Sequence, residues 1–251
     1  MKHTFTSRMA VAALAMSLGL VAGTANAVPT LQLGIAGGSY DSTTETIISS
    51  GSSFSLYAFL KEDTGNLLTD TYYLSMALTP QFSTSANLGS FTYDGNTVNV
   101  TSDMTYGTPP IDAFTSASDP GDLATHSVFP TYFKEIGFSF DSSNQSGVFN
   151  TQDHPSWGPQ SGTGMYYNLF NIDTSNLAAG YEIHFDLYNT KLCSKDKGQC
   201  ASNIDTDITQ FAPFSHDAQS MAVIPEPETY AMMLAGLGLL GFSARRRKDN
   251  A

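Results

Sequence analysis

Short runs of alternating apolar and polar residues, separated by turn-forming residues, most restrict the fold of this 251-residue chain. The clearest run is 181–188. It places one set of side chains on one side (Tyr181, Ile183, Phe185, Leu187) and a second set on the other (Glu182, His184, Asp186, Tyr188). Successive side chains of a β-strand point to opposite faces, so this run predicts a strand with a buried and a solvent-facing side.

The strongest local signal is a β-hairpin centred on Asp94-Gly95. Segments 89–93 and 97–101 favour extended backbone, and Gly95 meets the positive φ of a tight turn at little cost. We expect segments 54–60 and 71–79 to pair antiparallel through a turn at 63–66. The other expected strands are 30–36, 40–48, 132–140 and 165–172, and one helical turn is expected within 174–180.

Eight or more short strands without a β–α–β alternation predict an all-β fold. The expected architecture is a single antiparallel β-sandwich over residues 28–222, and a jelly roll is one version of it. That length is sufficient for one domain with its own core. Segments 103–127 and 141–164 are rich in turn-forming residues, and we expect them to be long loops.

Residues 1–27 have the features of a signal peptide. Lys2 and Arg8 precede an apolar stretch, 9–21, and Ala25-Asn26-Ala27 supplies a small-residue cleavage site. We expect export through the Sec machinery and a mature chain that starts at Val28. An uncleaved membrane anchor is the alternative.

Residues 223–251 combine three elements with different physical properties. Pro225-Glu226-Pro227 is stiff and incompatible with a helix, segment 231–244 carries no charge, and Arg245, Arg246, Arg247 and Lys248 form a basic cluster. The apolar segment predicts a transmembrane helix shorter than the roughly 20 residues of a stable span. Insertion into the inner membrane would then be transient, and an ordinary single-pass anchor is the alternative.

This tail resembles a PEP-CTERM protein-sorting signal, in which Pro-Glu-Pro, a short apolar helix and an arginine cluster follow in that order. The same kind of tail is also labelled an ice-binding protein C-terminal domain, a label that says nothing about ice for this chain. The resemblance implies processing by an exosortase near Pro225-Glu226-Pro227. It also implies delivery to the surface or exterior of a Gram-negative bacterium, often one that makes exopolysaccharide.

Four stretches of the central region are similar to the choice-of-anchor N proteins. They are Leu31 to Gly38, Asp103 to Pro110, His126 to Glu135 and Asp207 to Asp217. This resemblance implies a surface domain of unknown biochemical activity, and it offers no catalytic residues.

The region between the two terminal signals is strongly acidic. Segment 28–224 holds five lysines, no arginine and twenty of the 23 acidic residues, a formal charge of −15 with histidines neutral. Such a surface repels phosphate backbones, so nucleic acid is not expected as a partner. It favours solubility and could attract divalent cations.

Cys193 and Cys200 are the two cysteines of the chain. In an exported protein they predict a disulfide that closes a short loop. A bond of this kind would stabilise the fold by roughly 2–3 kcal/mol. Two free thiols are the alternative, and the spacing does not match a zinc site.

Two acidic clusters are candidate calcium sites, because carboxylates close together on a loop can supply oxygen ligands. One is Asp119 and Asp122 near His126, and the other is Asp205 and Asp207 near His216-Asp217. Neither matches an EF-hand, and Asp in turns commonly binds nearby backbone N–H groups instead. No other cofactor is expected.

Two functional hypotheses follow for the central domain. The first is a non-enzymatic surface or matrix protein, associated with exopolysaccharide or biofilm, with Trp157, Tyr166 and Tyr167 as candidate sugar-stacking residues. The alternative is a secreted carbohydrate-active hydrolase, for which Glu135, Glu182 or Asp186 would supply the carboxylates. His184 beside Asp186 is a candidate pair, but the chain has no Gly-x-Ser-x-Gly, His-Glu-x-x-His or P-loop motif.

Overall fold

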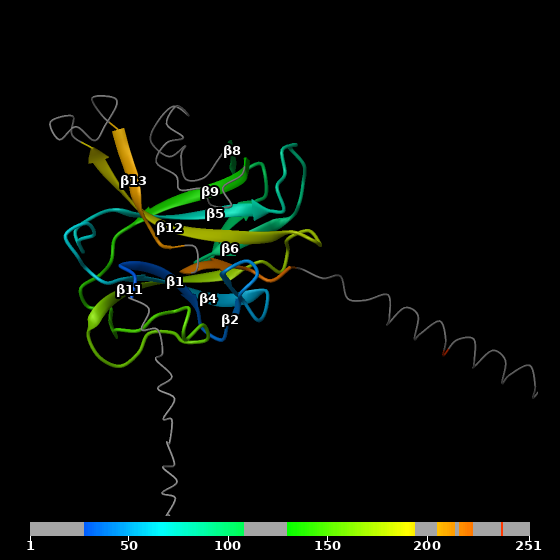
Figure 1. The fold of residues 1–251 in the computed structure, drawn as a ribbon. Helices are drawn as coiled ribbons and strands as arrows, with labels where there is room; N and C mark the ends of the chain where they lie inside the picture. Colours follow the sequence, from blue (N-terminus) through cyan, green and yellow to red (C-terminus); the bar gives the residue numbers. More distant parts are fainter. Residues whose placement is uncertain (1–27, 108–129, 194–204, 214–215, 223–236, 238–251) are drawn as a thin grey trace, which may run out of the picture.

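The computed structural model describes residues 28–107, 130–193, 205–213, 216–222 and 237. Fourteen strands in these segments form two sheets, which confirms the predicted all-β class. Figure 1 shows the sheets one above the other, with β5, β9 and β12 in one layer and β1, β4 and β11 in the other.

The first sheet, sheet A, has the order β1-β4-β11-β6-β7, with β10 paired to β11, and all its pairs are antiparallel. Its strands are β1 (Leu31–Ile35), β4 (Ser53–Leu60), β6 (Ser90–Tyr93), β7 (Asn96–Asn99), β10 (Gln145–Gly147) and β11 (Gly164–Asp173).

The second sheet, sheet B, has the order β2-β3-β14-β12-β5-β9-β8, with β13 also paired to β12. Its strands are β2 (Ser39–Asp41), β3 (Thr46–Ile48), β5 (Tyr72–Thr79), β8 (Thr105–Gly107), β9 (Thr131–Phe138), β12 (Glu182–Cys193), β13 (Asp205–Phe211) and β14 (Asp217–Gln219). β14 and β3 are parallel, so the expectation of wholly antiparallel pairing was wrong at this point. Parallel neighbours need a long crossover, and the chain between these two strands provides it.

The two sheets share one hydrophobic core, which lies between their facing sides. Phe54 of β4 packs edge-to-face on Phe185 of β12 with ring centroids 6.0 Å apart, and Phe138 of β9 packs on Phe170 of β11 at 5.2 Å. Leu56 and Leu74 are fully buried in this core. We call the core-facing side of each sheet its inner face and the opposite side its outer face.

The predicted hairpin of β6 and β7 is confirmed, with Tyr93 opposite Asn96. Asp94 and Gly95 have φ values of 46° and 77°, the positive φ at both central residues that a tight I′ turn requires. The carboxylate of Asp94 also accepts a 2.8 Å hydrogen bond from the backbone N–H of Asn171. The turn is therefore held against β11.

The predicted pairing of segments 54–60 and 71–79 was wrong. β4 pairs with β1 and β11, whereas β5 pairs with β12 and β9 in the other sheet. Asp63 does cap a turn, because its Oδ1 accepts hydrogen bonds from the N–H groups of Gly65 and Asn66 at 2.7 and 2.8 Å. This turn belongs to a crossing between sheets, so turn residues alone did not indicate which strands would pair.

Two smaller expectations also changed. Segment 40–48 forms two short strands, β2 and β3, which pair with each other. Within 174–180, a turn is present in which the N–H of Leu177 donates to the carbonyl of Thr174 at 3.0 Å.

The predicted signal peptide, 1–27, lies outside the described residues, as does all of the predicted helix 231–244 except Leu237. Among the residues that the structure describes, none belongs to a helix long and apolar enough to cross a membrane.

Candidate functional site

Several of the predicted site residues lie outside the described segments. These are Pro225, Glu226, Pro227, Arg245, Arg246 and Arg247 of the tail, Asp119 and Asp122 of the first acidic cluster, and Cys200. The sorting roles, the first calcium site and the disulfide therefore stay predictions.

The second acidic cluster lies on β13, and its register with β12 is defined. Asp205 is opposite Cys193, and Asp207 is opposite Lys191. Asp205 and Asp207 lie two residues apart on this strand. The expectation that they belong to a loop was therefore wrong. Calcium binding by these two residues stays a prediction.

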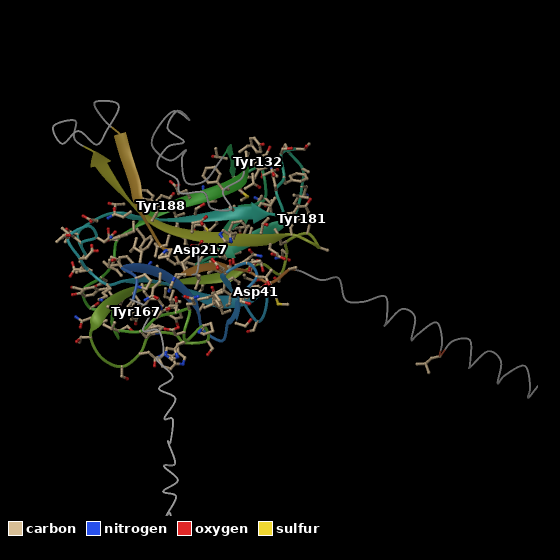
Figure 2. All side chains as sticks on the ribbon, viewed as in Figure 1. Asp41, Tyr132, Tyr167, Tyr181, Tyr188 and Asp217 are labelled. Carbon is tan, nitrogen blue, oxygen red and sulfur yellow. The ribbon has the colours of Figure 1, made fainter. Side chains whose placement is uncertain are left out.

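The three candidate sugar-stacking aromatics do not share one surface. Tyr166 packs against the main core, whereas its neighbour Tyr167 lies on the outer face of sheet A. Figure 2 shows Tyr167 on the sheet A side of the molecule, with Tyr132 and Tyr188 on the sheet B side. Tyr166 thus lies on the face opposite to Tyr167, because adjacent strand residues point to opposite faces. Sugar stacking by Trp157, Tyr166 and Tyr167 stays a prediction.

The outer face of sheet A carries a second, smaller aromatic cluster. Phe59, Phe149 and Met165 are buried there, and Tyr57 and Tyr167 pack against them. Trp157 lies at the rim with 38% of its surface exposed, and its ring stacks on that of His154 at 3.7 Å with an interplanar angle of 5°. Trp157 and Tyr167 are thus the two predicted sugar-stacking residues that remain on one side of the domain.

A cluster of ionisable side chains lies on the outer face of sheet B. His184 and Asp186 lie two residues apart on β12 and therefore share one face. The pairing of His184 with Gln219 brings Asp217 of β14 beside them. His184 Nε2 lies 3.4 Å from Asp186 Oδ1 and 3.9 Å from Asp217 Oδ2. Residues from two distant segments of the chain thus meet across two neighbouring strands.

This face was predicted to be solvent-facing, and that prediction was wrong for Asp186 and Tyr188, whereas Glu182 and His184 are half-buried. Asp186, Tyr188 and Asp217 are 8%, 0% and 2% exposed. The alternation along β12 identified correctly which side chains share a face. It could not show that the polar face would also be buried.

Two further side chains orient the histidine. His184 Nδ1 lies 3.3 Å from Gln219 Oε1, and the amide nitrogen of Gln219 donates to Glu182. Because a carbonyl oxygen only accepts, the hydrogen bond requires a proton on Nδ1 of His184. Nε2 is therefore the ring nitrogen directed at the two carboxylates.

Burial and charge act together on these groups. Burial alone would lower the pKa of His184, but the carboxylate of Asp186 and the hydrogen bonds of the ring outweigh it and raise this pKa. Burial, followed by the nearby charge of Asp186, raises the pKa of Asp217 well above its usual range. Burial also raises the pKa of Glu182, against the opposing hydrogen bond from Gln219. The surroundings therefore favour the protonated forms of His184, Asp217 and Glu182 when no other cation is present.

Ser75 of β5 adds a hydroxyl to this cluster. It lies directly opposite Asp186 in the antiparallel pair of β5 and β12, so both side chains are on the outer face. Ser75 is fully buried, and its Oγ has no hydrogen-bond partner among the described residues. A buried hydroxyl without a partner is uncommon in native structures and calls for a physical reason.

The three carboxylates considered for hydrolysis all belong to sheet B and all have partners. Glu182 accepts from Gln219, Asp186 contacts His184, and Glu135 accepts a hydrogen bond from the hydroxyl of Tyr188. A surface hollow lined by Ser55, Thr92 and Asn171, among others, lies on sheet A instead.

Sequence reasoning named His184 and Asp186 as a pair and placed Asp217 in a different cluster. Ser75 and Gln219 were not identified at all. Alternation within 181–188 was sufficient for the first pair, but the other three residues join it through strand pairing between distant segments.

Comparison with known families identifies a sorting motif near the end of the chain. Residues 223–248 match the model of the PEP-CTERM protein-sorting motif. No curated protein and no solved structure matches the chain significantly. The motif implies export, sorting to the cell surface and exosortase as the sorting partner.

Proposed function

We propose that this protein is a non-enzymatic component of the cell surface or extracellular matrix of a Gram-negative bacterium. Its precursor would be exported through the Sec machinery, held transiently in the inner membrane and processed by an exosortase. The observation that carries this proposal is the match of residues 223–248 to the PEP-CTERM protein-sorting motif.

The position of the β domain supports the same reading. β14 ends at Gln219, so the matched segment begins four residues beyond the last strand of sheet B. A cut near Pro225-Glu226-Pro227 would therefore leave every strand of the domain in the mature protein. The resemblance to choice-of-anchor N proteins also favours a surface domain joined to a separate sorting tail.

The acidic composition and the partners of the carboxylates favour a non-enzymatic role. Glu135, Glu182 and Asp186 each contact another side chain on sheet B, which makes them less suited to serve as a free acid and base pair. The association with exopolysaccharide or biofilm is part of the proposal. It rests on the resemblance of the tail to sorting signals that are often found in bacteria that make exopolysaccharide.

Mass spectrometry of the intact secreted protein tests the processing step. We expect a mature form that lacks Arg245, Arg246 and Arg247, and a precursor that accumulates in membranes when Pro225 and Pro227 are both replaced by alanine. Pro213→Ala is the matched control, because this exposed proline lies before β14 and outside the motif. Recovery of a secreted form that retains the arginine cluster would overturn the proposal.

A second candidate function is carbohydrate binding on the outer face of sheet A. The exposed Trp157 ring, stacked on His154, is the observation that favours it, because flat aromatic surfaces pack against sugar rings.

A further inference from the structure

We propose that His184, Asp186 and Asp217 form a binding site for a divalent transition-metal cation, best matched by Zn²⁺, with Ser75 Oγ as a neighbouring oxygen donor. The site is independent of the sorting signal and of the aromatic face. It lies on the outer face of sheet B, where β12 is flanked by β14 and β5.

The geometry is close to that of a metal site. One ligand atom from each of His184, Asp186 and Asp217 can be chosen so that all three lie within 4.8 Å of one another. Bonds of about 2.0–2.2 Å from zinc to nitrogen and oxygen place tetrahedral ligand atoms roughly 3.5 Å apart. The observed separations of 3.4 and 3.9 Å from His184 Nε2 therefore need only small side-chain movements.

The histidine already has the tautomer that a metal ligand needs. Gln219 Oε1 faces Nδ1, so the lone pair of a neutral His184 ring lies on Nε2, which is directed at the two carboxylates. Gln219 is fixed in turn by its hydrogen bond to Glu182. Metal-binding histidines commonly have their second ring nitrogen held by such an outer partner.

The charges also fit a dication. Two carboxylates in a buried position repel each other unless protons or a cation neutralise them. A divalent cation with a neutral histidine would neutralise Asp186 and Asp217 together. The acidic surface of the domain would favour its approach.

Ser75 supplies an independent indication. Its hydroxyl is fully buried beside Asp186 without a hydrogen-bond partner among the described residues, on the same face as the cluster. A bound cation, or a water molecule on that cation, would give this hydroxyl a partner.

The donor set selects the class of metal. Calcium and magnesium prefer oxygen ligands alone, whereas an imidazole nitrogen with carboxylate oxygens suits zinc and its transition-metal neighbours. This site is therefore distinct in position and chemistry from the calcium sites predicted at Asp119, Asp122, Asp205 and Asp207.

Titration of the full chain with ZnCl₂ after removal of metals with EDTA tests the site. We expect one Zn²⁺ per chain by calorimetry and native mass spectrometry, together with a rise in melting temperature. Asp217→Asn and His184→Gln should each weaken binding at least tenfold. His154→Gln and Asp94→Asn, which change exposed residues on the sheet A side of the domain, should leave it unchanged.

Ser75→Ala keeps the test decisive if the other variants fold poorly. Its hydroxyl has no protein partner among the described residues, so the metal-free variant should melt within about 2 °C of the native protein. We expect its Zn²⁺ affinity to fall severalfold. The absence of stoichiometric binding, or binding that is unchanged in both Asp217→Asn and Ser75→Ala, would show that the cluster is only a structural ion pair and would overturn the proposal.

Discussion

The side-chain amide of Gln32 binds the backbone of Thr151, 119 residues farther along the chain. Its Oε1 accepts the N–H of Thr151 at 2.9 Å, and its Nε2 donates to the carbonyl of Phe149, also at 2.9 Å. Gln32 is fully buried on β1. One polar side chain in a strand thus replaces the backbone pairing that segment 149–151 would otherwise need, and it fixes this segment on the outer face of sheet A.

Replacing Gln32 with leucine should strongly destabilise the domain. The change leaves the N–H of Thr151 and the carbonyl of Phe149 buried without their partners, at a cost of roughly 2–4 kcal/mol in the free energy of unfolding. Urea denaturation measures the difference. Gln145→Leu is the matched control, because Gln145 is exposed and its side-chain amide donates to the nearby carbonyl of Ser142. Equal midpoints for the two variants would contradict this role of Gln32.

Two glycines with similar backbone angles should respond differently to alanine. Gly89 and Gly95 have φ values of 84° and 77°, which both disfavour a side chain. A Cβ at Gly89 would lie 2.0 Å from the carbonyl oxygen of Asn176, whereas a Cβ at Gly95 would contact nothing within 4 Å.

We therefore expect Gly95→Ala to lower the free energy of unfolding by about 1 kcal/mol and Gly89→Ala by roughly 3 kcal/mol or more. Thermal or urea unfolding measures both changes, and the difference between them isolates the steric clash. A smaller effect at Gly89 than at Gly95 would show that the bridge between Gly89 and Leu177 is not closely packed.

His216 should make the domain less stable at mildly acid pH. Burial lowers the pKa of this residue from 6.5 to about 4, and its Nε2 lies 2.9 Å from Asn150 Oδ1. Between pH 6.5 and 4 the unfolded chain takes up a proton that the folded protein does not. The stabilisation is therefore complete above pH 6.5 and falls by up to about 3 kcal/mol as the pH approaches 4.

Melting temperatures measured from pH 7.5 to 4 in EDTA report this loss. The stability advantage of the native protein over His216→Gln should shrink as the pH falls through that window, because the raised pKa values of His184 and Asp217 contribute with opposite sign in both proteins. A curve with the same slope in His216→Gln as in the native protein would assign the pH dependence to other groups.

The neighbours Tyr166 and Tyr167 should separate stability from sugar binding. Tyr166 packs on the main core, so Tyr166→Ala should lower the free energy of unfolding by roughly 2–4 kcal/mol. Trp157→Ala and Tyr167→Ala should instead weaken binding to polysaccharides on a glycan array, each by about tenfold. Full binding by both of these variants, with the fold intact, would exclude the outer face of sheet A as the carbohydrate site.

Local patterns predicted the elements of this fold better than their partners. The Asp94-Gly95 turn specified its hairpin because all of its determinants lie within a dozen residues. The turn at Asp63 was equally clear, yet β4 and β5 belong to different sheets. Turn chemistry shows that the chain changes direction, and the wider core decides whether the next strand stays in the same sheet.

The same distinction explains what was missed in the candidate metal site. His184 and Asp186 lie two residues apart in one strand, so alternation alone put them on one face. Asp217 and Ser75 reach that face through the pairing of β12 with β14 and β5, which spans more than thirty residues on one side and about a hundred on the other. Neither pairing has a local sequence signature.

The parallel pair of β14 and β3 has a kinetic consequence. Asp217 lies opposite Thr46, so this part of sheet B cannot close until residue 217 is available to a segment 171 positions earlier. Contacts over such separations form slowly, because the entropy of closing the loop opposes them before any packing compensates. If the chain crosses an export channel from its N-terminus, sheet B would therefore stay incomplete until residue 217 has emerged, shortly before the sorting signal follows. Late closure of sheet B would thus prevent the domain from completing its fold before export is nearly complete.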